Sequence, residues 1–399
     1  MEKKIKTSVK SLDYYGRGIA DLPKKTFVRN SLPGEDIELV ITKEHKSFDE
    51  GITTKLLKKS PKRVPSLCPY FPKCGGCDLR HLLYPDTIDY TINNIKSILK
   101  DYINDDTLIN IYKSKNYGRN KITLKVSNKK IGFYEKSSHN LIEINACLNV
   151  KDSINKVLPY LKSLNIIDGE VLIRSNYVNK LLIAIKTNNK VDITPLKSLT
   201  NVEGIILNDK TIYKNDYFND KVDDYIFKVS YKSFFQVNSY INGKIFNILK
   251  SELDTEKNVL DLCSGVGTLS ILASTFSKKV YAIEISKSNY LDSLENKRMN
   301  KVENVDFLLG DAFTLLNDID DKIDTIIIDP PRSGISKKGL QSILDYNCEK
   351  VIYISCNPIT LRRDLAHLTK RYKLDKLFIL DMFMYTYHAE TVVVLERRE

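Results

Sequence analysis

The C-terminal third of the chain alternates short apolar segments with turns and helical patterns, and no other feature of the sequence limits the fold as strongly. A helical pattern at residues 239–253 comes first. Seven short apolar segments follow it: VLDLC (259–263), VYAIE (280–284), VDFLLG (305–310), DTIIID (324–329), VIYISC (351–356), LFILD (377–381) and TVVVLER (391–397). Strands and helices that alternate in this way build a parallel sheet with helices on both faces. The sequence therefore predicts an α/β fold, with a doubly wound domain over residues 231–399.

The residues before this domain divide into two further parts. Residues 1–60 contain short apolar runs separated by Gly and Pro, which is typical of a small β-barrel. Residues 61–80 are dense in Pro, Cys and Gly, and residues 86–103 have the apolar spacing of one amphipathic helix. Five strand candidates then indicate a mixed α+β region: KITLKVS (121–127), KIGFYE (130–135), EVLIRS (170–175), KLLIAIK (180–186) and VEGIILN (202–208). We therefore expect three domains, at 1–60, 61–230 and 231–399.

The positive charge is concentrated in the first third of the chain. The net charge is +12, and residues 1–130 carry 26 Lys and Arg against 15 Asp and Glu, whereas the remaining 269 residues carry 36 against 35. Such an excess attracts the phosphate backbone of nucleic acids. A solvated, lysine-rich surface accounts for the charge equally well. Composition alone leaves both interpretations open.

The sequence also indicates where the protein works. No run reaches the roughly 18 uninterrupted apolar residues that a membrane span needs, so we expect no membrane partner. The opening MEKKIKTSVKS lacks the apolar core and cleavage site of a secretory signal, which favours the cytoplasm. In that reducing compartment the seven cysteines indicate metal binding or catalysis more often than disulfides.

A cofactor site is predicted at the end of the first strand of the α/β domain. Gly265 and Gly267 follow that strand and precede a helix that begins near Thr268, a pattern that also occurs in ordinary tight turns. Glu284 ends the second strand, where a carboxylate can bind both hydroxyls of a ribose, and Asp311 follows the third strand, placed to meet an adenine edge. The third glycine of a dinucleotide-binding loop is missing. This favours S-adenosylmethionine, which has no phosphates.

Two later segments carry candidate reactive groups. Cys356 stands at the end of the predicted strand VIYISC, and the acidic turn DPPRSG (329–334) precedes it. A single cysteine at a strand end is often a small buried apolar residue. The segment DMFMYTYHAE brings His388 and Glu390 before the last strand; it reads as a surface turn or as part of a site.

These segments together resemble the RNA uracil-5-methyltransferases that use S-adenosylmethionine. DPPRSG and VIYISCNPIT match the first family signature, and DMFMYTYHAE resembles the second, with Met384 where the family has proline. Ala389 also stands where the family has a larger apolar residue. SFFQVN (233–238) resembles the segment whose glutamine, here Gln236, binds the cofactor. Cys263 occupies a cofactor-pocket position at which the family usually has an aromatic residue.

The resemblance implies a fold and a mechanism. It implies a Rossmann-like methyltransferase domain, an OB-like TRAM barrel that binds RNA, and a central α+β domain. Carbon-5 of uracil is too weak a nucleophile for direct methylation, so a thiolate, assigned to Cys356, adds to carbon-6 first. Glu390 then removes the carbon-5 proton as a general base. Asp329 is expected between the cofactor and the base, and Arg332 is a candidate RNA contact.

Four further cysteines form a predicted metal site. Cys68, Cys74 and Cys77 have the spacing C-x5-C-x2-C, and Cys147 lies far downstream. This spacing suits a structural zinc or an iron-sulfur cluster and does not distinguish them. The family resemblance implies a 4Fe-4S cluster with a structural role.

The expected activity is methylation of uracil carbon-5 in structured RNA. Family members with a TRAM barrel and a cluster resemble the bacterial enzymes that act on 23S ribosomal RNA, which we therefore expect as the substrate of a monomeric enzyme. The alternatives are a transfer RNA methyltransferase and a catalytically idle RNA-binding protein of the same fold. Cytosine-5-methyltransferases also use a cysteine, but usually in a different local sequence.

Overall fold

A computed structural model of the chain describes residues 4–115 and 118–398, and it divides into two compact units. The first unit comprises Met1–Asn94, Phe133–Ile144 and Phe383–Tyr387. The second comprises Ile95–Gly132, Asn145–Met382 and His388–Glu399. Each unit is therefore assembled from segments that lie far apart in the sequence. The three predicted domain ranges remain a prediction.

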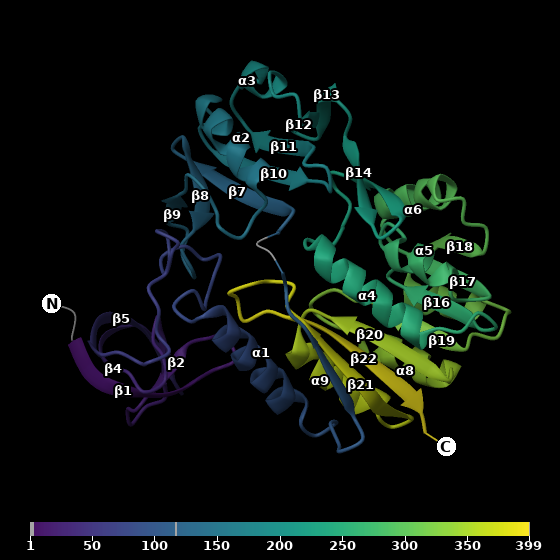
Figure 1. Cartoon of the computed structure of the whole chain (residues 1–399), viewed down its shortest axis with the longest axis horizontal. Coiled ribbons are helices and arrows are strands. Elements are labelled where there is room, and N and C mark those ends of the chain that lie inside the picture. The colour runs from purple at the N-terminus through teal and green to yellow at the C-terminus, as the bar shows by residue number, and fades with distance from the viewer. Residues whose placement is uncertain (1–3, 116–117, 399) are drawn as a thin grey trace. The chain divides into compact units, whose positions relative to one another are not determined.

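The first unit begins with a closed five-stranded barrel, as the sequence predicts for residues 1–60 (Figure 1, purple). Its strands follow the order β1-β2-β3-β5-β4. They are β1 (Lys4–Leu12), β2 (Gly18–Ala20), β3 (Thr26–Arg29), β4 (Asp36–Glu44) and β5 (Asp49–Lys58). Closure leaves no unpaired sheet edge, and a small apolar core fills the interior: Val9, Ala20, Val28, Ile37 and Leu39.

A buried ion pair ties the barrel to the cysteine-rich segment that follows it. Glu35 is fully buried and accepts hydrogen bonds from the Leu32 amide at 2.8 Å and from Arg63 Nη2 at 2.9 Å. Residues 61–83 form no helix or strand, as expected, and only isolated bridges occur there. Helix α1 (Tyr84–Leu99) comes next and begins two residues before the predicted helix.

A seven-stranded sheet contains the predicted strands of the α+β region. Its order is β13-β12-β11-β10-β7-β8-β9, and a separate pair is formed by β14 and β15. The strands are β7 (Lys121–Ser127), β8 (Lys130–Tyr134), β9 (Leu141–Glu143), β10 (Gly169–Ser175), β11 (Leu181–Thr187), β12 (Val202–Leu207), β13 (Lys210–Lys214), β14 (Tyr217–Val222) and β15 (Tyr225–Ser230). Helices α2 (Asp152–Ser163) and α3 (Thr194–Lys197) accompany it. All five strand candidates are confirmed to within one residue at each end.

An eight-stranded sheet forms the core of the second unit, in the order β18-β17-β16-β19-β20-β22-β21-β6 (Figure 1). The strands are β6 (Leu108–Tyr112), β16 (Asn258–Leu262), β17 (Lys279–Glu284), β18 (Val305–Leu309), β19 (Thr325–Ile328), β20 (Lys350–Ser355), β21 (Tyr372–Leu380) and β22 (Glu390–Arg397). Strands β16 to β20 pair in parallel, whereas β22 runs antiparallel to both β20 and β21. The α/β class is therefore confirmed, and the sheet is mixed at one side.

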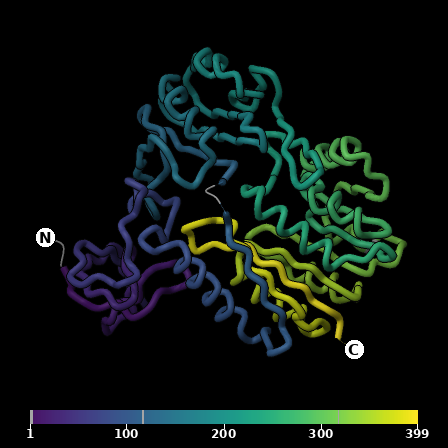
Figure 2. The backbone as a smooth tube through the Cα atoms, viewed as in Figure 1, coloured from purple at the N-terminus to yellow at the C-terminus, as the bar shows by residue number. Residues whose placement is uncertain are grey.

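Strand β6 joins this sheet from more than 200 residues upstream and pairs in parallel with β21. From the sequence we expected residues 108–112 to belong to the α+β region that follows them. The expectation was wrong because a short apolar run does not indicate which distant strand it pairs with. Figure 2 follows this stretch of chain into the sheet formed by the yellow C-terminal strands.

Side-chain caps fix where most helices of the α/β region begin. Asn238, Ser286, Ser336 and Asn357 each precede a helix and accept a hydrogen bond from a backbone amide of its first turn, which satisfies a donor that the helix leaves unpaired. The helices are α4 (Ser239–Glu252), α5 (Thr268–Ser274), α6 (Lys287–Met299), α7 (Ala312–Leu315), the 3-10 turn Leu316–Asp318, α8 (Lys337–Tyr346) and α9 (Pro358–Leu368). Among the described residues, no helix has the length and apolarity that crossing a membrane requires.

Candidate active site

The predicted reactive residues gather at one edge of the eight-stranded sheet. Asp329 directly follows β19 and Cys356 directly follows β20, so both lie at the carboxyl ends of parallel strands. Glu390 is the first residue of β22, and the antiparallel register places Thr391 opposite Ser355. The start of β22 therefore lies beside the end of β20. The three residues therefore lie at the same end of the sheet.

Hydrogen bonds lock the turn after β19 to the start of helix α9. The carbonyl oxygen of Arg332 accepts hydrogen bonds from Asn357 Nδ2 at 3.2 Å and from Thr360 Oγ1 at 3.3 Å. The two signature segments DPPRSG and SCNPIT thus form one structural element. Thr391 Oγ1 donates to the Ser355 carbonyl at 2.9 Å and ties β22 to the same turn.

Helix α9 also fixes the far end of the DPPRSG turn. Buried Asp364 accepts a hydrogen bond from the Ile335 amide at 2.9 Å and from Tyr353 Oη at 2.7 Å. Gly334 has φ +73°, and a Cβ there would lie 2.6 Å from Asp364 Oδ2. Only glycine fits this left-handed and crowded position.

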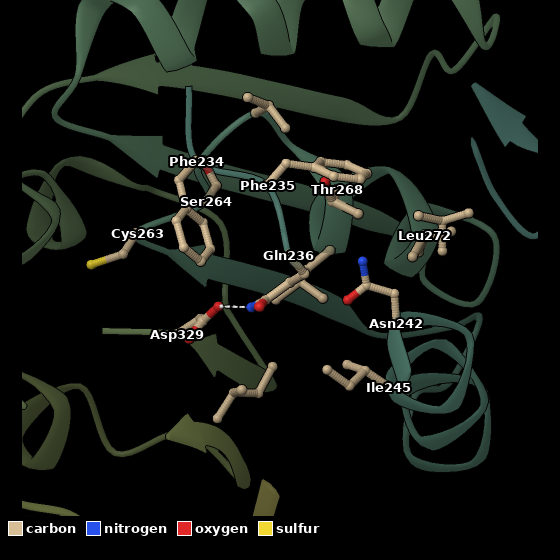
Figure 3. Close-up of a pocket in the computed structure, with 15 residues that line it drawn as sticks. Phe234, Phe235, Gln236, Asn242, Ile245, Cys263, Ser264, Thr268, Leu272 and Asp329 are labelled. Atoms are coloured by element: carbon tan, nitrogen blue, oxygen red, sulfur yellow. Dashed lines mark hydrogen bonds between the residues drawn. The ribbon is translucent and has the colours of Figure 1, made fainter. Parts of the chain in front are cut away.

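A pocket beside these residues contains four of the predicted cofactor residues. Gln236, Cys263, Thr268 and Asp329 all line it. Figure 3 shows Gln236 and Asp329 directed toward each other, and Gln236 Nε2 donates to Asp329 Oδ2 at 3.3 Å. Gly265 also lines the pocket, and no neighbouring atom lies within 4 Å of the position that a Cβ would occupy there. A ligand can therefore approach the backbone closely there.

Two predicted cofactor residues do not line this pocket. Glu284 is buried and accepts hydrogen bonds from the Gly265 and Ser286 amides, each at 2.7 Å. Its carboxylate holds the glycine loop, and remaining lone pairs can accept from a ribose. Asp311 is exposed and caps α7, accepting from the Thr314 amide at 3.0 Å. Their assigned contacts with ribose and adenine remain predictions.

The structure adds residues that the sequence reading did not single out. Phe234 lines the pocket and is 56% exposed, an unusual position for a phenylalanine. Phe234 belongs to the SFFQVN segment, so the predicted cofactor residue Gln236, two positions later, was the sequence signal that could have identified it.

Ser270 stands where a dinucleotide-binding loop would have its third glycine, and its side chain has a structural role. Ser270 Oγ donates a hydrogen bond to buried Asp261 at 2.5 Å. Burial raises the pKa of Asp261 to about 7.

Burial dominates the electrostatics of the reactive groups. It raises the pKa of the Cys356 thiol to about 11; the Glu390 charge adds to that shift and Arg332 opposes it. Burial also raises the pKa of Glu390 well above its ordinary value, with Asp329 adding to the shift and Arg332 opposing it. Among the described residues Glu390 Oε1 has no hydrogen-bond partner. The site thus holds a protonated thiol beside a carboxyl group with a raised pKa.

The four predicted metal ligands fall into different units. Cys68, Cys74 and Cys77 belong to the first unit, and Cys147 belongs to the second. Arg80 Nε donates to Cys77 Sγ at 3.3 Å. Within residues 4–115 and 118–398, no three or more His, Cys, Asp or Glu side chains are grouped as a metal site. The cluster therefore remains a prediction.

Comparisons with known proteins agree with this arrangement. A profile of the family described as tRNA (Uracil-5-)-methyltransferase matches residues 143–398. An RNA methyltransferase of Caldanaerobacter subterraneus subsp. tengcongensis is 32% identical, over 99% of this chain and 98% of its own length. An RNA methyltransferase of Aquifex aeolicus is 30% identical over 100% of both chains.

One solved structure shares the fold over nearly the whole chain. It is the Pyrococcus abyssi tRNA (uracil-54, C5)-methyltransferase in complex with S-adenosyl-L-homocysteine. The TM-score is 0.79 at 22% identity, and the match covers 98% of this chain and 100% of that chain. At this identity the likeness establishes the fold.

The raised pKa of Cys356 predicts a slow and pH-dependent alkylation of the free enzyme. Only the thiolate reacts with iodoacetamide, so the rate should rise about tenfold per pH unit from pH 7 toward a pKa of about 11. Arg332→Ala removes the charge that stabilises the thiolate and should slow the reaction further. Peptide mass spectrometry would follow Cys356 separately from the other cysteines.

The matched control is Arg362→Ala, because Arg362 is half-exposed and pairs with Asp101 instead. Its alkylation profile should equal that of the wild type. An inflection below pH 8 in the unmodified protein would contradict the raised pKa of the Cys356 thiol.

Proposed function

Because this chain belongs to the tRNA (uracil-5-)-methyltransferase family and is an S-adenosylmethionine-dependent RNA (uracil-5-)-methyltransferase, we propose that it converts a uridine of 23S ribosomal RNA to 5-methyluridine. The convergence of Cys356, Glu390 and Asp329 beside the Gln236 pocket carries this proposal. The chemistry needs a nucleophile, a base and a cofactor pocket at one place, and this edge of the sheet provides all three.

The pocket suits S-adenosylmethionine. Open space beside Gly265 and the exposed ring of Phe234 allow a flat, uncharged group to approach, and Asp329 provides a carboxyl group at the end of β19, the parallel neighbour of β16. We assign Gln236, Cys263, Thr268 and Asp329 to direct contact with the cofactor. Glu284 and Asp311 are assigned to its ribose and adenine. When bound, the cofactor supplies a methyl group activated by a positive sulfur.

Cys356 starts the reaction by forming a bond from Sγ to carbon-6 of the uracil. The electron pair of the carbon-5 to carbon-6 double bond moves into the ring carbonyl as an enolate, and carbon-5 then takes the methyl group. Because the free thiol is protonated, its proton must leave when the substrate binds. Arg332 assists by stabilising the thiolate, and it remains a candidate RNA contact.

Glu390 completes the reaction by taking the proton from carbon-5. The bond between Sγ and carbon-6 then breaks and restores the double bond. A carboxylate with a raised pKa is a stronger base than an ordinary one. Its Oε1 has no hydrogen-bond partner in the part of the chain that the structure describes, so it is available for this proton. The target uridine has to leave its stack before Cys356 can reach carbon-6.

The choice of ribosomal RNA rests on the N-terminal features. The barrel and the excess of positive charge in residues 1–130 favour a large, structured RNA. We propose that residues 1–60 form a TRAM barrel, 61–230 a central RNA-binding domain and 231–399 a Rossmann-like methyltransferase domain of a monomeric, cytoplasmic enzyme. A transfer RNA substrate is the second candidate, because the structural neighbour named above acts on tRNA.

We further propose that Cys68, Cys74, Cys77 and Cys147 hold a 4Fe-4S cluster with a structural role. At the CGGC turn, a Cβ at Gly75 would lie 2.9 Å from the Tyr134 carbonyl oxygen, so glycine is required there, whereas a Cβ at Gly76 would make an ordinary contact of 3.5 Å with Cys74 Sγ. The proposal is supported by the donor set, because thiolates are the ligands of iron-sulfur clusters.

A pair of variants tests the assigned nucleophile and base. Cys356→Ala should abolish methylation and leave cofactor and RNA binding intact, whereas Cys348→Ala should remain active because Cys348 is buried away from the site. Glu390→Gln should slow the release step by about 10²- to 10⁴-fold and accumulate a covalent protein–RNA adduct on a denaturing gel. The double variant should show no adduct.

Full turnover by Cys356→Ala would refute the assigned mechanism. A binding-competent wild-type protein that transfers no methyl group to any RNA would instead support the idle RNA-binding alternative.

Mapping 5-methyluridine by mass spectrometry tests the RNA substrate. Cells that lack the gene should lose the modification at one or more sites of 23S rRNA and keep it in tRNA. Loss of 5-methyluridine from tRNA alone would instead identify tRNA, the second candidate, as the substrate.

Metal analysis tests the cluster. Protein purified without oxygen should contain about four iron and four acid-labile sulfide per chain. Cys77→Ala should lose them and Cys348→Ala should retain them. One zinc per chain would refute the assignment.

A further inference from the structure

A short segment in front of the catalytic base belongs to the first unit, although the strands on either side belong to the second. This base loop, residues Phe383–Tyr387, connects β21, which ends at Leu380, to His388 and Glu390. Its neighbours in space are the cysteine-rich segment, the start of α1, the Tyr14–Tyr15 turn and the chain around Lys136. The position of Glu390 is therefore linked, through three to seven residues of chain, to the N-terminal unit.

The centre of the base loop is held by its main chain. The carbonyl oxygen of Tyr385 accepts hydrogen bonds from the Asp78 amide at 2.9 Å and the Leu79 amide at 3.0 Å. Both donors directly follow Cys77. Tyr385 has φ +60°, a left-handed conformation that is unfavourable for a bulky side chain. Such a conformation persists only where the surroundings impose it.

Side chains hold the same residue from two sides. The Arg80 guanidinium lies 4.6 Å from the centre of the Tyr385 ring, and the ring of Tyr84 lies at 5.7 Å. Arg80 is 6% exposed, so its contact with the ring is largely shielded from water and stronger than a surface contact.

The downstream end of the base loop has a second anchor. The ring of Tyr387 packs edge-on against Tyr14 at 5.4 Å and Tyr15 at 5.2 Å, and Lys136 Nζ lies 5.5 Å from its centre. Lys136 also pairs with the carboxylate of Asp78. Asp78 therefore contributes to both anchors, with its amide at Tyr385 and its carboxylate through Lys136.

We propose that residues 78–80, Tyr84 and Lys136 are positioning residues that hold the base loop and thereby aim Glu390 at carbon-5 of the bound uracil. The inference rests on the proposed function. A general base must lie within hydrogen-bond reach of its proton, and an error of about 1 Å can cost on the order of 100-fold in rate. Glu390 begins β22, where it pairs with Leu380 of β21. The sheet therefore fixes its main chain, and the two anchors act on the loop that ends three residues before it. Cys356, which reaches the site from β20, does not depend on this loop for its position.

Variants of Arg80 and Tyr385 separate the two chemical steps. In Tyr385→Asn the ring is lost, but asparagine tolerates the left-handed backbone; in Arg80→Ala the backbone contacts remain. Both should still form the covalent adduct and should release RNA from it about 10- to 100-fold more slowly. The measurements are adduct formation and release by rapid quench and denaturing gel, using unmodified 23S rRNA and tRNA transcripts, whichever the wild type methylates.

Conservative variants and a matched control complete the experiment. Tyr385→Phe and Arg80→Lys should restore release, since they keep the ring and the cation. Lys250→Ala removes a comparable cation of helix α4 from Phe276, whose ring centre lies 5.8 Å away, and should behave as the wild type. Equilibrium RNA binding should stay unchanged in all five variants.

Three results would overturn the inference. One is wild-type release by both Tyr385→Asn and Arg80→Ala, and another is a parallel loss of RNA binding and methyl transfer without accumulated adduct. The third is failure of the conservative variants to restore release. If Glu390→Gln itself accumulates no adduct, the proposed mechanism fails instead, so the two failures can be told apart.

Discussion

The carbonyl oxygen of Arg332 is the point on which the catalytic edge of the sheet depends. It accepts hydrogen bonds from Asn357 and Thr360, so the turn that carries Asp329 cannot move independently of the turn that carries Cys356. Asn357 also caps α9, and that helix holds the far end of the DPPRSG turn through Asp364. Two strand ends and one helix thus form a rigid frame.

Burial gives this frame its chemical character. The same desolvation that raises the pKa of Cys356 also raises those of Glu390 and Asp329, because a poorly hydrated site disfavours every negative charge. The charge of Arg332 opposes the pKa shifts of both Cys356 and Glu390. With its pKa raised to about 11, the Cys356 thiol is mostly protonated near neutral pH. In the proposed mechanism, uridine binding has to change this balance, which would couple the reactivity of the thiol to the presence of substrate.

In the proposed role of the base loop, the general base depends on a part of the protein that contributes no reacting group. The barrel and the cysteine-rich segment, residues 1–83, belong to the first unit and carry 17 Lys and Arg against 10 Asp and Glu. It also includes the five residues that lead to His388 and Glu390. A left-handed Tyr385, held by two amides that follow Cys77, is locally unfavourable. The contacts of Tyr385 within the first unit must compensate for this cost.

The sequence by itself determined the α/β class, the barrel, the helix at the glycine loop and the strand ends that carry Asp329 and Cys356. These features depend on local apolar periodicity and on short turn motifs, which are written in consecutive residues. The pairing of β6 with β21 was missed, because strand partners are chosen by long-range packing that a short apolar run does not encode. The assignment of residues 383–387 to the first unit was missed for the same reason. Glu284 and Asp311 were correctly placed at strand ends, yet only the tertiary structure showed that one holds the glycine loop and the other caps a helix. The order of residues decides which groups reach the edge of the sheet, and packing between distant segments decides which way each of them faces.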